Sequence, residues 1–184
     1  MSSRKVVIDL IDGLILDQKG VLFEQEEELI RYSYHVAGTV GVMMCDVLKC
    51  DNSLAKSFAI DLGIAMQLTN IARDVLEDAK MGRRYLPGTW VQNISPKEIV
   101  LAAKTNDLKK IHIISKGIKK LLILAEQYYL SGEKGFNDIL DDEYLSQLMP
   151  LNLYGWSKHV IDRFIWNESK QKNKPSQCVG LKFF

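Results

Sequence analysis

Apolar side chains recur at three- and four-residue intervals along most of this 184-residue chain, which is the spacing of amphipathic α-helices. No stretch alternates apolar and polar residues as a strand does, and no segment of the sequence is repeated. We therefore predict an all-α protein with a single main domain. Helices are expected over residues 4–17, 24–47 and 53–78, from 96, over 107–132, over 141–149 and after 150.

Capping and loop signals divide the pattern. Ser95-Pro-Lys-Glu98 is a capping box with proline at the first helical position, and either Asn106 or Asp107 caps the helix that follows. Residues 80–88 are short, basic and interrupted by glycine, which predicts a loop after the 53–78 helix.

One narrow polar stripe runs along the otherwise apolar stretch 59–78. At about 100° per residue, its members fall on a single arc of the helix: Gln67, Asn70, Asp74 and Asp78. Buried carboxylates are costly unless they are paired or bound to a cation, and Asp74 and Asp78, one turn apart, repel each other. Mg²⁺ prefers a few carboxylates together with phosphate oxygens. The stripe predicts a Mg²⁺–diphosphate site that faces into a helical bundle.

A solvated helix surface is the ordinary explanation of an Asp-x-x-x-Asp pair. Two features favour the functional interpretation here. The stripe contains the amides Gln67 and Asn70 where a surface helix would carry Lys and Glu, and the other faces are too apolar for a surface helix. Arg73, Arg83 and Arg84 follow within reach, and guanidinium groups match phosphate oxygens. The 80–88 loop is placed to act as a lid over a diphosphate.

Two glycines, Gly38 and Gly41, interrupt the 24–47 helix, and each costs about 1 kcal/mol relative to alanine. Close packing against another helix and room for a substrate chain explain them equally well.

Composition narrows the classes of function. A net charge of +1 with no basic, aromatic-rich run excludes nucleic-acid binding as the main activity. Cys45, Cys50 and Cys178 form no Cys-x-x-Cys pair, so we expect neither a disulfide framework nor a zinc site, and a cytoplasmic location. No secretory signal or membrane-spanning run is visible, so any membrane contact would be peripheral.

Two segments resemble the squalene/phytoene synthase family. The first is Gln67-Leu-Thr-Asn70-Ile-Ala-Arg73-Asp74-Val-Leu-Glu77-Asp78 with Gly82-Arg-Arg-Tyr85-Leu-Pro87, similar to the family's second aspartate-rich motif. The second is Tyr32-Ser-Tyr-His-Val-Ala-Gly-Thr-Val-Gly41, which is most similar to bacterial phytoene synthases. The resemblance covers residues 8–166 and weakens after Pro87. It implies that residues 1–166 are part of an isoprenoid-synthase-type helical bundle around a cavity, with 167–184 as a loose polar tail.

The resemblance implies head-to-head condensation of two geranylgeranyl diphosphates to phytoene in carotenoid biosynthesis, with Mg²⁺ or Mn²⁺ assisting diphosphate loss. It assigns Asn70, Asp74 and Asp78 as metal ligands, and Arg73 and Tyr85 as diphosphate contacts in the catalytic set. A squalene-type synthase that uses farnesyl diphosphate is the alternative enzyme. The residues expected to bind the substrate are Tyr32, Val36, Ala37, Val40, Gly41, Ala59, Gly63, Gln67 and Tyr154.

The family's first aspartate-rich motif has no counterpart here, since Asp9, Asp12 and Asp17 are not spaced like it. Three explanations follow: a fragment of a full-length enzyme, which we favour, a subunit completed by a separate polypeptide, or a non-catalytic assembly protein. The intact Asp74 and Asp78 argue against the third. We expect the chain alone to be inactive, and the apolar faces of helices 32–47 and 59–78 to be exposed where the missing helices would pack.

Overall fold

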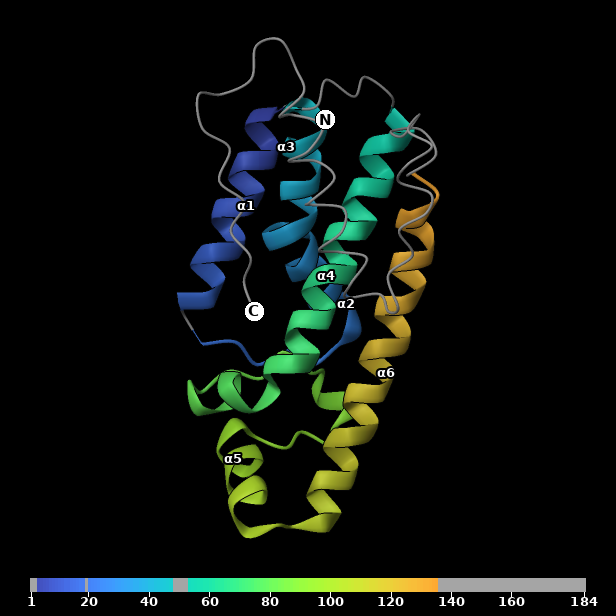
Figure 1. The fold of residues 1–184 in the computed structure, drawn as a ribbon. Coiled ribbons are helices and arrows are strands. Elements are labelled where there is room, and N and C mark those ends of the chain that lie inside the picture. Colours follow the sequence, from blue (N-terminus) through green and yellow to red (C-terminus); the bar gives the residue numbers. More distant parts are fainter. Residues whose placement is uncertain (1–2, 19, 48–52, 136–184) are drawn as a thin grey trace, which may run out of the picture. The chain divides into compact units, whose positions relative to one another are not determined.

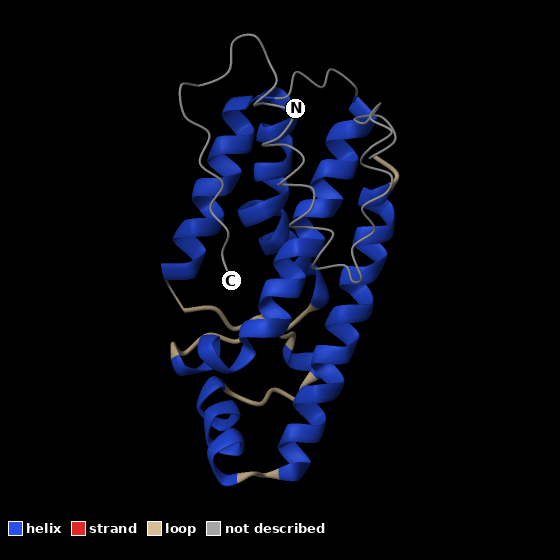
Figure 2. Ribbon diagram, viewed as in Figure 1, coloured by secondary structure: helices blue, strands red, loops and turns tan. Residues whose placement is uncertain are grey.

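The computed structural model describes residues 3–18, 20–47 and 53–135, all within the unit Met1–Ile139. These residues form helices joined by loops and contain no strand (Figure 2), so the all-α prediction is confirmed. The helices expected over 141–149 and after 150, Tyr154 and the tail 167–184 lie outside the described residues. The elements are α1 (Ser3–Gln18), α2 (Glu26–Ser33), the π-helical turn η1 (Tyr34–Gly38), α3 (Thr39–Val47), α4 (Ser53–Lys80), the 3₁₀ turn η2 (Gly88–Trp90), α5 (Pro96–Thr105) and α6 (Leu108–Glu133).

The central helix is α4, which packs along α6 and also contacts α2, η1, α3 and α5 (Figure 1). On the other side of the unit, α1 packs against η1 and α3. The core brings together leucines from distant parts of the chain, and Leu29, Leu68, Leu86 and Leu121 are each at most 1% exposed. Burying a leucine side chain contributes about 1.5–3 kcal/mol, so these contacts fix the position of α4.

The capping predictions for α5 and α6 are confirmed. The Ser95 hydroxyl accepts a hydrogen bond from the Glu98 amide, and the Glu98 carboxylate accepts one from the Ser95 amide. Of the two candidates for the next cap, Asp107 is the one that accepts bonds from the amides of Lys109 and Lys110. Asn106 adopts a left-handed conformation (φ 55°) and ends α5.

The helix predicted over 24–47 is continuous but irregular, because the π-helical turn η1 separates α2 from α3. Its acidic start works as expected, since the Glu28 carboxylate accepts bonds from the amides of Glu24 and Gln25, both at 2.8 Å. The spacing of the apolar residues did not predict this widened turn. Such π-turns inside α-helices often mark functional sites.

Close helix packing accounts for the glycines between α4 and the η1–α3 segment. A Cβ atom on Gly41 would lie 2.3 Å from the carbonyl oxygen of Ala59, and one on Gly63 would lie 2.5 Å from that of Ala37. A Cβ atom on Gly38 would meet side chains first, at 3.0 and 3.3 Å, and the carbonyl oxygen of Ile60 at 3.5 Å. Of the two explanations that the sequence left open, the structure supports backbone contact between the helices.

The largest group of exposed apolar side chains lies on α1, and the expectation that they would lie on helices 32–47 and 59–78 is wrong. Within these two ranges, Val40 is the one large apolar side chain among the described residues that is markedly exposed. On α1, the carboxylates of Asp9 and Asp17 face inward and accept hydrogen bonds from tyrosines. The outward residues of this helix are 39–51% exposed, namely Val7, Ile8, Ile11, Leu14, Ile15 and Leu16. None of the described helices is both long and apolar enough for a membrane crossing.

Candidate active site at the carboxyl end of α4

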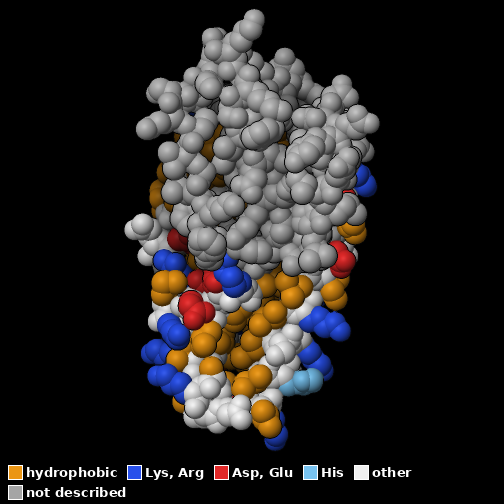
Figure 3. All heavy atoms as spheres, in the orientation of Figure 1, with side chains coloured by type: hydrophobic (Ala, Val, Ile, Leu, Met, Phe, Trp, Pro, Cys, Tyr) orange, Lys and Arg blue, Asp and Glu red, His pale blue; other side chains and the backbone are white. Residues whose placement is uncertain are grey.

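The polar stripe of α4 lies at the edge of the core. Gln67, Asn70, Asp74 and Asp78 are all partly buried, whereas the neighbouring Leu68 and Ile71 are fully buried. The stripe therefore borders the protein interior, as the sequence predicted, and is not a fully solvated surface. On the face shown in Figure 3, charged side chains of both signs gather beside a strip of apolar ones.

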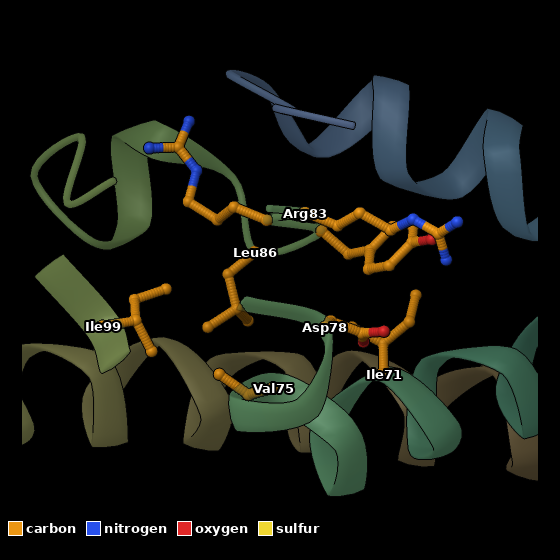
Figure 4. Close-up of a pocket in the computed structure, with 8 residues that line it drawn as sticks. Ile71, Val75, Asp78, Arg83, Leu86 and Ile99 are labelled. Atoms are coloured by element: carbon orange, nitrogen blue, oxygen red, sulfur yellow. The ribbon is translucent and has the colours of Figure 1, made fainter. Parts of the chain in front are cut away.

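Asp78 lines a small pocket between α4, the loop that follows it and α5. Figure 4 shows Asp78 beside Ile71 at one end of the pocket, with Arg83 across from them. Burial, and after it the negative charge of Asp74, raises the pKa of Asp78 to about 6, although Arg83 acts in the opposite direction. The residues lining the pocket are Ile71, Val75, Asp78, Arg83, Arg84, Tyr85, Leu86 and Ile99.

Asp74 is held by its neighbour. The Arg73 guanidinium donates two hydrogen bonds to the Asp74 carboxylate, at 2.7 and 2.6 Å, and this lowers the pKa of Asp74 despite partial burial. Both side chains are more than a third exposed, and such surface pairs contribute at most about 1 kcal/mol. A divalent cation bound to Asp74 could therefore displace Arg73 from this carboxylate at a cost of at most about 1 kcal/mol.

The three arginines divide into different roles. Arg84 is 4% exposed and donates to the carbonyls of Ile94 and Phe23 and to the Glu24 carboxylate, at 3.1, 2.9 and 2.6 Å. This corrects the sequence interpretation, because the Arg84 guanidinium is committed to joining the loop to the segment before α2. Arg83 is only partly buried and lines the pocket, so it stays available to an anion.

Tyr32 and Tyr85 converge on an aspartate that the sequence analysis set aside. Both hydroxyls donate to the Asp17 carboxylate, at 2.8 Å from Tyr32 and 2.7 Å from Tyr85. Their rings stack at 5.1 Å between centroids, with Phe23 against both. Burial is the main reason why the pKa of Tyr85 rises to about 12, and it also raises the pKa of Tyr32.

The spacing of Asp17 from Asp9 and Gly13 could have indicated that its side chain faces inward. Asp9, Gly13 and Asp17 recur at intervals of four and so share one face of α1. In the structure this face turns inward: Asp9 accepts a hydrogen bond from Tyr34, and Gly13 is buried against His35 and Val36.

The residues predicted to line the prenyl chain form contacts with each other. The backbone of Gly41 meets that of Ala59, and Gly63 meets Ala37. The lining role of these residues stays a prediction. Of the remaining members, Val36 and Gln67 are partly buried, Tyr32 is buried and Val40 is 41% exposed.

The donor set fits a divalent cation in part. Among the described residues, no three His, Cys, Asp or Glu side chains gather closely enough to hold a metal by themselves. Asn70, Asp74 and Asp78, however, lie at successive turns of α4, and the Asp74 charge already disfavours ionisation of Asp78. A cation would relieve this repulsion. Mg²⁺ commonly uses one or two carboxylates and completes its shell with substrate phosphate and water.

Comparison with known proteins places the chain in a family. The squalene/phytoene synthase family model matches residues 2–163. The chain is 36% identical over 135 residues to a phytoene synthase of Pseudescherichia vulneris, covering 73% of this chain and 42% of that one. It is 39% identical over 132 residues to a 15-cis-phytoene synthase of a Paracoccus strain, covering 72% and 41%. The chain thus spans about two-fifths of the length of these relatives.

A solved structure shares the fold. The squalene synthase HpnC from Alicyclobacillus acidocaldarius superposes with a TM-score of 0.64 at 15% identity, covering 90% of this chain and 56% of that one. At this identity the likeness concerns the fold alone. The family match and the relatives above show that this chain belongs to the squalene/phytoene synthase family.

Proposed function

We propose that this chain supplies the second aspartate-rich half of a prenyltransferase that joins two geranylgeranyl diphosphates head-to-head to form phytoene. The relatives named phytoene synthase support the reaction class. The observation that carries the proposal is Asp78, a partly buried carboxylate with a like charge one turn away, in a pocket that also holds Arg83. Such an arrangement is unfavourable unless it binds a cation.

Asn70, Asp74 and Asp78 would hold Mg²⁺, with Mn²⁺ as the alternative. When bound, the ion neutralises the leaving diphosphate and so favours formation of an allylic cation. Arg73 is a proposed diphosphate contact, and Arg83 joins it because it lines the same pocket as Asp78. Tyr85, the other contact that the resemblance assigns, lines this pocket as well. The apolar wall of Ile71, Val75, Leu86 and Ile99 keeps water from the reactive end of the substrate.

A chain of two-fifths the relatives' length is proposed to be inactive alone, with the remaining helices supplied by a longer chain or by a separate subunit. We propose a cytoplasmic protein with peripheral contact to the membrane in which its product would dissolve.

The first test is calorimetric binding of inorganic pyrophosphate with Mg²⁺ to the isolated chain. We expect binding by the wild type, and binding about a hundredfold weaker after Asp78→Asn, since even the outer groups of a metal site are worth 10–100-fold in affinity. Glu77→Gln is the matched control, because Glu77 is the exposed neighbour paired with Lys80 at 3.4 Å. Equal binding by the wild type and Asp78→Asn would refute the proposed site.

The second test addresses the reaction. The chain is supplied with the upstream part of a relative, such as the 15-cis-phytoene synthase of Pantoea ananas, to which it is 38% identical over 127 residues. We expect phytoene from labelled geranylgeranyl diphosphate and none from the chain alone. Preferential use of farnesyl diphosphate would instead support a squalene-type reaction.

A further inference from the structure

The last turn of α1 is connected directly to the loop after α4. Asp17 lies one residue before the end of α1, and Tyr85 lies in the loop between α4 and η2. The Tyr85 hydroxyl donates to Oδ1 of Asp17 at 2.7 Å, and Tyr32 donates to both carboxylate oxygens at 2.8 and 2.9 Å. A hydrogen bond to an ionised group is stronger than one between neutral groups, so these contacts hold the two rings firmly.

Each of the two tyrosines therefore already donates its hydroxyl proton to Asp17. A phenol has a single O–H donor, and for Tyr85 it points to Asp17. With its ring 6% exposed and stacked on Tyr32, Tyr85 is fixed in place. In this arrangement Tyr85 has no proton to donate to a diphosphate.

The fixed position of Tyr85 affects Arg83, which lies two residues earlier in the same loop. Arg83 and Tyr85 line the pocket together with Asp78, and the charge of Arg83 acts on both. Arg84 is a second anchor of this loop, through its guanidinium bonds to Phe23, Glu24 and Ile94. Arg83 comes directly before these two anchors in the sequence and lines the pocket across from Asp78 (Figure 4).

We propose that Asp17 is a positioning residue for the diphosphate site: by accepting the hydroxyls of Tyr85 and Tyr32, it anchors the loop that holds Arg83 across from Asp78. This inference rests on the proposed function and assigns Tyr85 an indirect role. Arg83 is then the loop's direct contact to the diphosphate.

The experiment measures binding of inorganic pyrophosphate with Mg²⁺ to the full chain by calorimetry. Asp17→Ala and Tyr85→Phe should each weaken binding about tenfold, the value of one charge-assisted hydrogen bond. The double variant should bind no more weakly than Asp17→Ala alone, because Asp17→Ala already removes the link that Tyr85→Phe removes. Asp17→Asn keeps one acceptor and should lose less. Asp12→Ala is the matched control, since Asp12 is exposed on the same helix.

Each outcome decides the matter. A folded Asp17→Ala that binds like the wild type overturns the inference while the proposed function stands, and so do additive losses in the double variant. Should Asp17→Ala fail to fold, Asp17→Asn and Tyr85→Phe carry the same cycle, because both keep the side-chain volume. Absence of binding by the wild type overturns the proposed function and the inference with it.

Discussion

The two halves of α4 meet the rest of the protein in opposite ways. From Ser53 to Leu68 the helix contacts α3 and η1 through backbone, with Gly63 against the carbonyl of Ala37 and Ala59 against Gly41. From Thr69 to Lys80 it carries the partly buried polar side chains, and Ile71, Val75 and Asp78 line a pocket formed with the following loop. One helix thus combines a section in close backbone contact with its neighbours and a section that borders a pocket.

This difference teaches that the first half orients the second. A helix whose glycines touch another backbone can neither rotate nor slide without a clash. The direction of Asn70, Asp74 and Asp78 is therefore set by a contact at Gly63, about two to four turns away. Rigid placement of this kind is what a site for a charged ligand requires.

The largest effect is expected from adding a methyl group at the glycine contact between α4 and η1. In Gly63→Ala the new Cβ atom would lie 2.5 Å from the Ala37 carbonyl oxygen and 2.9 Å from the Gly38 Cα atom, so the helices must separate. We expect a loss of about 3 kcal/mol in the free energy of unfolding, measured with urea. Gly38→Ala should cost less, because its nearest neighbours are side chains that can shift. Equal midpoints for Gly63→Ala and the wild type would show that this contact does not orient α4.

A smaller effect should distinguish the two loop arginines. Arg84→Lys keeps the charge near Glu24 but removes the guanidinium bonds to the buried carbonyls of Ile94 and Phe23, of which Phe23 keeps the bond from the Gly88 amide. We expect a loss of about 2 kcal/mol in unfolding free energy. Arg83→Lys should change stability by less than about 0.5 kcal/mol while weakening pyrophosphate binding. If Arg83→Lys were the destabilising variant and Arg84→Lys the one that weakens pyrophosphate binding, the roles assigned to the two arginines would be exchanged.

The smallest effect is a pH dependence centred on Asp78. Its pKa of about 6 in the folded chain lies above its ordinary value of 3.8, so the folded state binds the proton more tightly than the unfolded state. The stability that this contributes is present below about pH 4 and is lost as the pH rises through 6. Relative to Asp78→Asn, the wild type should therefore lose unfolding free energy between pH 4 and 7.

Carboxyl NMR titration sharpens the same point. Asp74→Asn should lower the Asp78 midpoint more than Glu77→Gln does, because Asp74 is the stronger of the two charges acting on it. A midpoint near 4 in the wild type would contradict the partial burial of Asp78.

What could be predicted from the sequence depended on the range of the interaction. The bounds of α4, the Ser95 capping box and a cap at Asn106 or Asp107 were predicted because their signals lie within a few residues of each other. The polar stripe is also a local signal; of its members Asp78 lines the pocket, and the cation site stays a prediction.

Contacts between residues far apart in the chain could not be predicted from the sequence. Asp17 meets Tyr85 across 68 positions of the chain, and nothing in either segment alone shows the pairing. Arg83 and Arg84 are adjacent and identical in chemistry, and only the packing of the segment before α2 separates an anchor from a pocket residue. The inward-facing carboxylates of α1 were missed because an apolar face usually turns to the core.

The π-turn η1 adds a constraint on how this protein can change in length. It sits between Tyr32, which bonds to Asp17, and Gly41, which touches Ala59. Removing one residue from Tyr34–Gly38 would restore an unbroken α-helix and leave the flanking helices in nearly the same orientation, because the widened turn absorbs one extra residue. A deletion in the regular turns of α2 or α3 would instead rotate Tyr32 relative to Gly41 by about 100°. Length changes between these two residues should therefore be confined to this turn.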